Sequence, residues 1–141
     1  MRRPYRFVDH TADVAASVSA ATLPQLFSNA SCALADLICA RRSVRPARRI
    51  RIAVQGDGPE DLLVRWLSEL LFQHESRGWV YSRFVVDRVD RKKMTASGAA
   101  VGEPFDDSRH RLNREVKAVT YHQLRIVRRA GRWCVRIVFD V

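Results

Sequence analysis

The fold is decided by residues 59–72, which read PEDLLVRWLSELLF. A proline followed by two carboxylates is typical of the first turn of a helix, and Gly78 is a typical helix end. Between these signals the apolar side chains recur at helical spacing, so they form one broad stripe that must be buried. The stripe consists of Leu62, Leu63, Trp66, Leu67, Leu70 and Leu71.

A second amphipathic helix is predicted closer to the N-terminus. Thr22 can cap it, and Pro24 then falls in its first turn. Apolar side chains follow at helical spacing from Leu23 to Ile38, and we expect the helix to end near Ala40. Six side chains of the two stripes are expected to be buried against a sheet: Phe27, Leu34, Leu37, Trp66, Leu67 and Leu70.

The rest of the chain is typical of strands joined by polar connectors. Apolar residues alternate with polar or small ones at 14–20 and 50–54, which predicts two half-buried strands. Ala130-Gly131 separates the last two β-rich runs and predicts a hairpin. The other predicted strand segments are 5–10, 79–81, 84–86, 94–101, 116–127 and 133–141, and the predicted connectors are 41–49 and 102–114.

This order of elements predicts an α+β fold, with two amphipathic helices packed on one mostly antiparallel β-sheet. No repeat, low-complexity segment or linker divides the chain. We therefore expect residues 1–141 to form a single domain, a length that can bury a core without disulfides or structural zinc.

Composition restricts the location and the partners. The formal net charge is +10, and 22 of the 25 basic residues are arginines, which bind phosphates and carboxylates well. No apolar run approaches the roughly 20 residues of a membrane helix, and none follows the basic N-terminus as in a secretory signal. Cys32, Cys39 and Cys134 are odd in number and form no C-x-x-C pair, so we expect buried thiols. These features predict a cytoplasmic protein without a membrane partner.

Two aspartates, Asp13 and Asp140, lie beside strand-like runs near opposite ends of the chain. A sheet could bring them together, and the terminal carboxylate of Val141 would add a third anion. Such a cluster repels itself unless a cation balances it, and hard oxygen ligands suit Ca²⁺ or Mg²⁺. The alternative is that each aspartate caps a turn or faces water.

Four segments, in this order, resemble the archease family. They read HTADV at 10–14, LFSNA at 26–30, DLL and WLSELLF within 61–72, and EVKAVTYH at 115–122, the last followed by FDV at 139–141. The first and fourth are the specific ones, since any amphipathic helix could supply the other two. Gly102-Glu103 also matches. The resemblance covers essentially the whole chain, and it implies the α+β order described above.

The resemblance further implies a metal site at Asp13, Asp140 and Val141, with Ca²⁺ more expected than Mg²⁺. It implies functional contacts for Glu115 and Lys117, which would share one face of a strand, and a supporting role for His10. Archease-like proteins activate RtcB-type RNA ligases of tRNA splicing and repair by promoting ligase guanylylation and multiple turnover. The expected protein is therefore an activator and not an enzyme, and no nucleotide-binding glycine motif occurs in the chain.

Two other functions stay open from the residues alone. One is a basic RNA-binding module that acts without a ligase, and the other is a metal-dependent phosphodiesterase, which the lack of further acidic or histidine motifs disfavours. The basic residues 41–51 are interpreted as a solvated connector and strand edge, with an RNA or ligase contact as the alternative. A structural role is expected for His122, and His74 and His110 are expected to be solvated.

Overall fold

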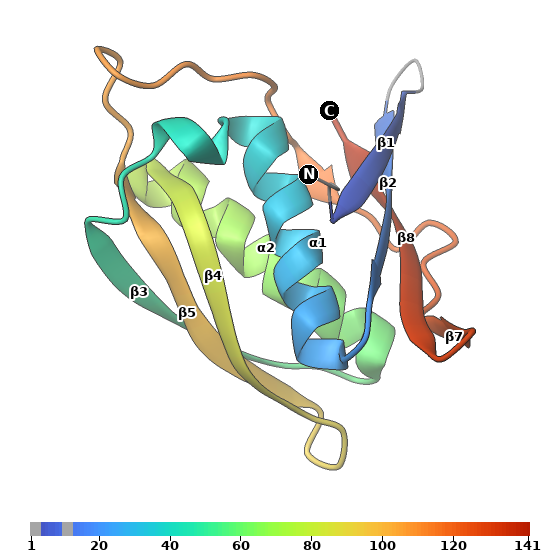
Figure 1. Ribbon diagram of the computed structural model, residues 1–141. Helices are drawn as coiled ribbons and strands as arrows, with labels where there is room; N and C mark the ends of the chain where they lie inside the picture. The colour runs from blue at the N-terminus through green and yellow to red at the C-terminus, as the bar shows by residue number, and fades with distance from the viewer. Residues whose placement is uncertain (1–3, 10–12) are drawn as a thin grey trace.

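Two helices lie between two antiparallel sheets in the computed structural model of the protein (Figure 1). The structure describes residues 4–9 and 13–141. The elements along the chain are β1 Tyr5–Asp9, β2 Asp13–Ala20, α1 Leu23–Ile38, a 3₁₀ turn Arg41–Ser43, β3 Arg48–Gln55, α2 Pro59–Arg77, β4 Trp79–Asp90, β5 Thr95–Pro104, β6 Ala118–Val119, β7 Val127–Arg129 and β8 Arg132–Asp140.

The strands are divided between the two sheets. One sheet has the order β1-β2-β8-β6, with β7 also paired to β8, and the other has the order β3-β5-β4. The α+β class and the packing of two amphipathic helices on antiparallel strands are confirmed, but the expectation of one sheet was wrong. Helix α1 explains the difference, because eleven of its sixteen residues are buried. A helix that is buried on most of its surface needs a cover on more than one side.

Both helix boundaries follow the expected local chemistry. The Thr22 hydroxyl accepts a hydrogen bond from the backbone N–H of Gln25 at 3.2 Å, which caps α1. Helix α2 begins at Pro59 and ends at Arg77, and the capping residue Gly78 adopts the left-handed conformation (φ 66°). The predicted limits of the two helices are confirmed.

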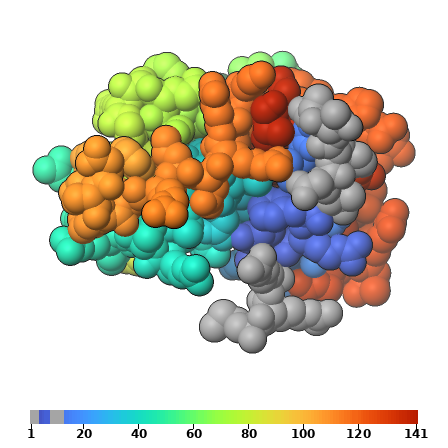
Figure 2. Space-filling model, turned by 90° about the horizontal axis from the view of Figure 1, so that it is seen from above, coloured from blue at the N-terminus to red at the C-terminus, as the bar shows by residue number. Residues whose placement is uncertain are grey.

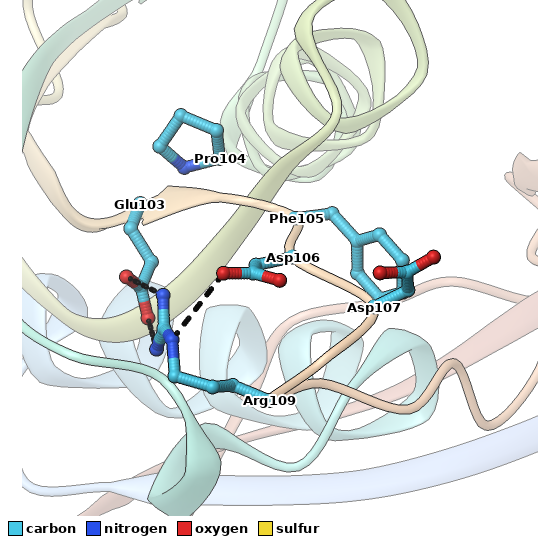
Figure 3. Close-up of a pocket in the computed structure, with 6 residues that line it drawn as sticks. All are labelled: Glu103, Pro104, Phe105, Asp106, Asp107 and Arg109. Carbon is cyan, nitrogen blue, oxygen red and sulfur yellow. Dashed lines mark hydrogen bonds and ion pairs between the residues drawn. The ribbon is translucent and has the colours of Figure 1, made fainter.

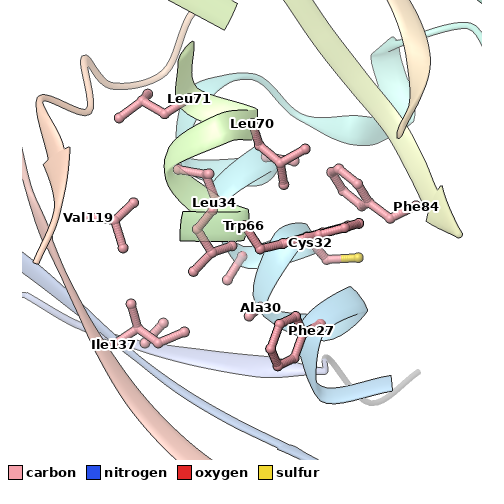
Figure 4. Packing of buried hydrophobic residues seen from close by; sticks show 14 of the residues in the cluster. Phe27, Ala30, Cys32, Leu34, Trp66, Leu70, Leu71, Phe84, Val119 and Ile137 are labelled. Carbon is pink, nitrogen blue, oxygen red and sulfur yellow. The ribbon is translucent and has the colours of Figure 1, made fainter. Parts of the chain in front are cut away.

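The core lies where the helices meet the sheets (Figure 4). Trp66 is fully buried and contacts the edge of Phe27, with 6.4 Å between the ring centroids. Its indole N–H donates to the Ser31 hydroxyl at 2.8 Å, so the polar atom is satisfied inside the core. All six side chains expected to be buried are buried: Phe27, Leu34, Leu37, Trp66, Leu67 and Leu70.

Part of the predicted strand content was wrong. The run 116–127 contains only the two-residue strand β6 and the first residue of β7. A turn interrupts it, in which Leu124 N–H donates to the Tyr121 carbonyl and Gln123 takes a positive φ of 51°. By contrast, 79–81 and 84–86 belong to the single strand β4, which continues through two irregularities in its register with β5.

The predicted hairpin turn is confirmed, and the structure also describes the three cysteines. The β7–β8 hairpin turns at Ala130 and Gly131, which both have positive φ, as its primed turn requires. Cys32 and Cys39 are buried and Cys134 is half-buried, and all three are free thiols. Within the described residues, no helix combines the length and the apolar character needed to span a membrane.

Truncation of the α2 stripe tests this packing. We predict that Leu70→Ala lowers the free energy of unfolding by about 2–5 kcal/mol, because it leaves a cavity at a fully buried position. Phe72→Ala on the same helix is the control, since Phe72 is 57% exposed and a surface change costs about 0.5 kcal/mol or less. Urea denaturation measures both values, and equal losses would mean that the helix phase is wrong.

Candidate functional site

The pairing of β2 with β8 places Asp13 directly opposite Asp140. The two residues are neighbours across an antiparallel ladder, so the strand that begins at Asp13 lies beside the last strand, as the sequence predicted. Asp140 is also paired with Ala118 of β6, and its carbonyl accepts a hydrogen bond from the Lys117 N–H at 2.7 Å. Both aspartates are half-buried. We call this place the aspartate corner: Asp13, Asp140 and Val141.

The Asp13 carboxylate is not fully satisfied by the described residues. Its Oδ1 atom is buried and has no hydrogen-bond partner among the described residues. A buried oxygen without a partner costs about 1–3 kcal/mol, and a second carboxylate on the facing residue adds like-charge repulsion. A cation bound by these oxygens would relieve both effects.

The corner offers oxygen donors of the kind that hard cations prefer. In residues 4–9 and 13–141, no three His, Cys, Asp or Glu side chains form a group that could hold a metal. Two carboxylates are present, and main-chain oxygens of Val141 are the nearest further donors along the chain. This donor set excludes a thiolate-type site and fits an alkaline-earth ion.

Glu115 and Lys117 lie on the chain segment that leads into β6. Both are exposed, whereas Val116 between them is 4% exposed and packs in the core. They were expected to share one face of a strand, but the segment that carries them has no regular secondary structure. Figure 2 shows this orange segment beside the red C-terminal residues on one face of the molecule. The predicted contact residues therefore border the aspartate corner.

Segment 105–117, which crosses this face, is fixed to the end of α1. The N–H groups of Asn113 and Arg114 donate to the carbonyls of Ile38 and Leu37 at 2.8 and 3.0 Å. The Asn113 side chain donates to the Asp36 carbonyl at 2.9 Å. These bonds satisfy helix carbonyls that have no partner within the helix. They also fix the position of residues 113–114, from which the segment continues to Lys117 beside Asp140.

The start of the same segment is held by Glu103 (Figure 3). Arg109 donates to both carboxylate oxygens of Glu103 at 2.7 and 2.9 Å, and the Arg45 N–H donates at 2.7 Å. The paired Arg109 guanidinium, ahead of these other bonds, lowers the pKa of Glu103 to about 2. Glu103 and Arg109 also line a shallow pocket of about 560 Å³.

His110 is the third partner of Glu103, and its expected solvation was wrong. The residue is 5% exposed. Its Nδ1 accepts from the Asp106 N–H at 2.9 Å, so the ring proton lies on Nε2, which donates to Glu103 at 2.9 Å. A partner seven residues away in sequence explains the burial, and no helical or strand periodicity reveals such a partner.

The Gly102-Glu103 pair has a structural explanation. A Cβ atom at Gly102 would lie 1.9 Å from the Val80 carbonyl oxygen, so only glycine permits the close approach of β4 at this point. The next residue, Glu103, is buried and accepts hydrogen bonds from Arg45, Arg109 and His110. The family resemblance included this pair, but the spacing of the residues in the sequence predicted no role for either of them.

Two of the family-like segments meet at the start of α2. The Tyr121 hydroxyl donates to Asp61 Oδ1 at 2.6 Å, and Arg65 donates to Asp61 Oδ2 at 2.8 Å. The bond from Tyr121, first, and those from Asp57 and Arg65 lower the pKa of Asp61 to about 2. Glu60 accepts from the Ile126 N–H at 3.0 Å. These contacts fix the turn at 120–126 on the helix.

Of the two histidines in the family-like motifs, His10 and His122, the structure describes only His122. His10 lies outside the described residues, so its predicted supporting role stays a prediction. His122 is exposed, and its N–H donates to the Thr120 hydroxyl at 3.3 Å. His74, expected to be solvated, is half-buried and its Nδ1 lies 2.8 Å from the Trp79 carbonyl.

Comparison with known proteins gives one consistent family. The family model described as "Archease protein family (MTH1598/TM1083)" matches residues 5–141. "Protein archease" of Methanopyrus kandleri is 39% identical and that of Pyrococcus furiosus is 37% identical, each alignment covering at least 98% of both chains. The solution structure of Methanobacterium thermoautotrophicum protein 1598 superposes with a TM-score of 0.86 at 30% identity, covering 99% of this chain and 100% of that one.

A more distant structure shares the fold. The crystal structure of a Thermotoga maritima archease, described as a possible chaperone, has a TM-score of 0.63 at 21% identity and covers 100% of this chain and 98% of that one. The arrangement of two helices and antiparallel sheets is therefore found in solved proteins of this type.

Removal of the Glu103 charge tests the anchored loop. We predict that Glu103→Gln lowers the free energy of unfolding at pH 7 by about 1–3 kcal/mol, because Arg109 and His110 lose a charged acceptor. The folded pKa of about 2 lies below the ordinary value of 4.5. The ion-pair contribution is therefore present above pH 4.5 and is lost as pH falls toward 2.

The variant should accordingly lose less stability than the parent between pH 4.5 and 2. Denaturant unfolding at several pH values measures this difference. An unchanged acid dependence would show that Glu103 is not held as an ion pair.

Proposed function

This chain belongs to the archease family, and we propose that it is a metal-binding accessory protein that activates an RtcB-type RNA ligase. In this role it promotes guanylylation of the ligase, and hence multiple turnover, in tRNA splicing or RNA repair in the cytoplasm. The nucleotide and RNA chemistry belong to the ligase, and this chain is the activator. The observation that carries the proposal is the buried Asp13 oxygen on the strand position facing Asp140, which has no hydrogen-bond partner in the part of the chain that the structure describes.

The proposed ligands of the cation are Asp13 and Asp140 through their carboxylates and Val141 through its main-chain oxygens. Ca²⁺ is favoured over Mg²⁺, because it accepts irregular sets of oxygen ligands, whereas Mg²⁺ demands near-ideal octahedral geometry. When bound, the ion supplies positive charge that neutralises the two facing carboxylates and can attract an anionic group of the partner. The strands hold the aspartates in position through the ladder hydrogen bonds of β2 and β8.

Glu115 and Lys117 are proposed as the contacts around the ion. Both are exposed beside the corner, and the Lys117 backbone is bonded to Asp140. Lys117 can meet a phosphate of the ligase complex, and Glu115 can bind the ion or a basic group of the ligase. Their shared segment is fixed at both ends, so the two side chains are presented without a large cost in backbone ordering.

The second candidate function is a basic RNA-binding module that acts without a ligase. The formal net charge of +10 favours it, and its signature is RNA affinity that falls steeply with salt. Stimulation of a purified ligase distinguishes the two functions, because only the first requires one.

Replacement of the corner aspartates separates metal binding from folding. We predict that Asp13→Ala and Asp140→Ala fold normally, because each removes like-charge repulsion in the metal-free protein. In the parent, calcium at 100 times its dissociation constant should add about 2.7 kcal/mol of stability and raise the Tm by several degrees. Both variants should lose this response, and ligase guanylylation over many turnovers should fall toward the unstimulated rate.

Asp87→Ala is the matched control, since Asp87 is exposed on β4 in the other sheet. It should keep the calcium response and the stimulation. A folded Asp13→Ala protein that stimulates the ligase as well as the parent would refute the proposed mechanism. A parent protein whose Tm is insensitive to both Ca²⁺ and Mg²⁺ would refute the metal site itself.

A further inference from the structure

The chain between the two acidic residues Glu115 and Asp140 has an unusual charge pattern. Residues 116–139 contain no carboxylate but carry one lysine and five arginines. Most of them fall on or next to the β7–β8 hairpin, which belongs to the β1-β2-β8-β6 sheet and lies opposite the β3-β5-β4 sheet in Figure 1. The arginines are Arg125, Arg128, Arg129, Arg132 and Arg136.

Three of these arginines line one groove on the outer face of the sheet. The groove has a volume of about 430 Å³ and lies across β2, β8 and β7, bordered by the segment 123–125. Arg125, Arg129 and Arg136 contribute positive charge, and Arg136 is the cross-strand partner of Ser17. Among the described residues that line it, none carries a carboxylate. We call this the arginine groove.

Part of the positive charge of the arginine groove has no carboxylate partner among the described residues. Arg125 and Arg129 are exposed, and neither forms an ion pair with any residue in the described part of the chain. Other arginines have partners within the protein. Arg65 forms an ion pair with Asp61, Arg109 forms one with Glu103, and the Arg128 guanidinium lies 4.8 Å from the centroid of the Trp133 ring. Like charges gathered in a concave surface raise its potential and attract an anion.

The other lining side chains indicate which anion. Ser17, Ser19 and Gln123 offer oxygen acceptors as well as donors, whereas guanidinium groups only donate. Among polynucleotide backbones only RNA carries a donor, its 2′-hydroxyl, which these oxygens can accept. Half-buried Val127 and Cys134, cross-strand partners, provide an apolar floor between the arginines. Such a floor can receive an unpaired base but not one held inside a duplex.

We propose that the arginine groove binds single-stranded RNA, with the arginines on phosphates and the serine and glutamine oxygens on ribose hydroxyls. This proposal does not rest on ligase activation. It places RNA binding apart from residues 41–51, for which an RNA contact was the alternative interpretation and where Arg41 is paired with Asp36 at 3.2 Å.

A charge-matched pair of variants tests the groove. The probe is a fluorescein-labelled 12-mer oligouridylate, followed by anisotropy between 50 and 200 mM NaCl, conditions that we choose to resolve the salt slope. Arg125→Gln/Arg129→Gln should bind about tenfold more weakly or worse, and its salt slope should fall by about 1.4, which is 0.7 for each lost phosphate contact. Arg48→Gln/Arg49→Gln removes the same charge from exposed positions on β3 and should retain the parent slope.

Four results would overturn the proposal. Equal weakening by both double variants would mean that net charge alone attracts RNA. Equal binding of oligodeoxythymidylate would contradict recognition of the ribose, and equal binding of a 12-base-pair duplex would contradict the role of the unpaired base. Displacement of the RNA by polyglutamate at equal charge concentration would assign the groove to an acidic protein. Circular dichroism of all variants confirms that differences do not come from unfolding.

Discussion

The pairing of β2 with β8 is the constraint on which the rest of the structure depends. Eight residue pairs, from Asp13 with Asp140 to Ala20 with Trp133, join segments more than a hundred positions apart in the chain. Closing so long a loop is costly in entropy, so the ladder must be supported by burial. Its inner face supplies that support with Val14, Ala16, Val18, Val135, Ile137 and Phe139, which all belong to the core.

The same register decides what the outer face displays. A slip of one residue would exchange the inner and outer faces, so burial of the inner valines and phenylalanine also fixes the outer positions. These are Asp13 with Asp140 at one end and Ser17 with Arg136 four residues further along, about 13 Å away. An acidic end and a basic groove are thus separate places on one surface, and each can bind its own ligand. The anchored segment 105–117 then adds Glu115 and Lys117 beside the acidic end.

The sequence predicted the features that depend on local order. The stripe around Trp66, the cap at Thr22 and the turn at Gly131 each require only neighbouring residues, and each was confirmed. The meeting of Asp13 with Asp140 was also predicted, because both lie beside strand-like runs and the family resemblance implies a shared site for them. The expectations that failed depend on distant partners. His110 is buried because Glu103 accepts a hydrogen bond from its ring N–H, and the run 116–127 turns because Tyr121 and Ile126 donate hydrogen bonds to the first turn of α2. The arginine groove was missed for the same reason, since it requires β2 and the hairpin together.

The central claim is that Asp13 and Asp140 hold one cation. Carbon-13 NMR of the side-chain carboxyl groups during a calcium titration tests it most directly. The account predicts that the Asp13 and Asp140 signals shift together and saturate at one equivalent of Ca²⁺, while exposed Asp87 and Asp107 stay unchanged. If the Asp13 and Asp140 signals move no more than those of Asp87 and Asp107, the aspartate corner is not a metal site.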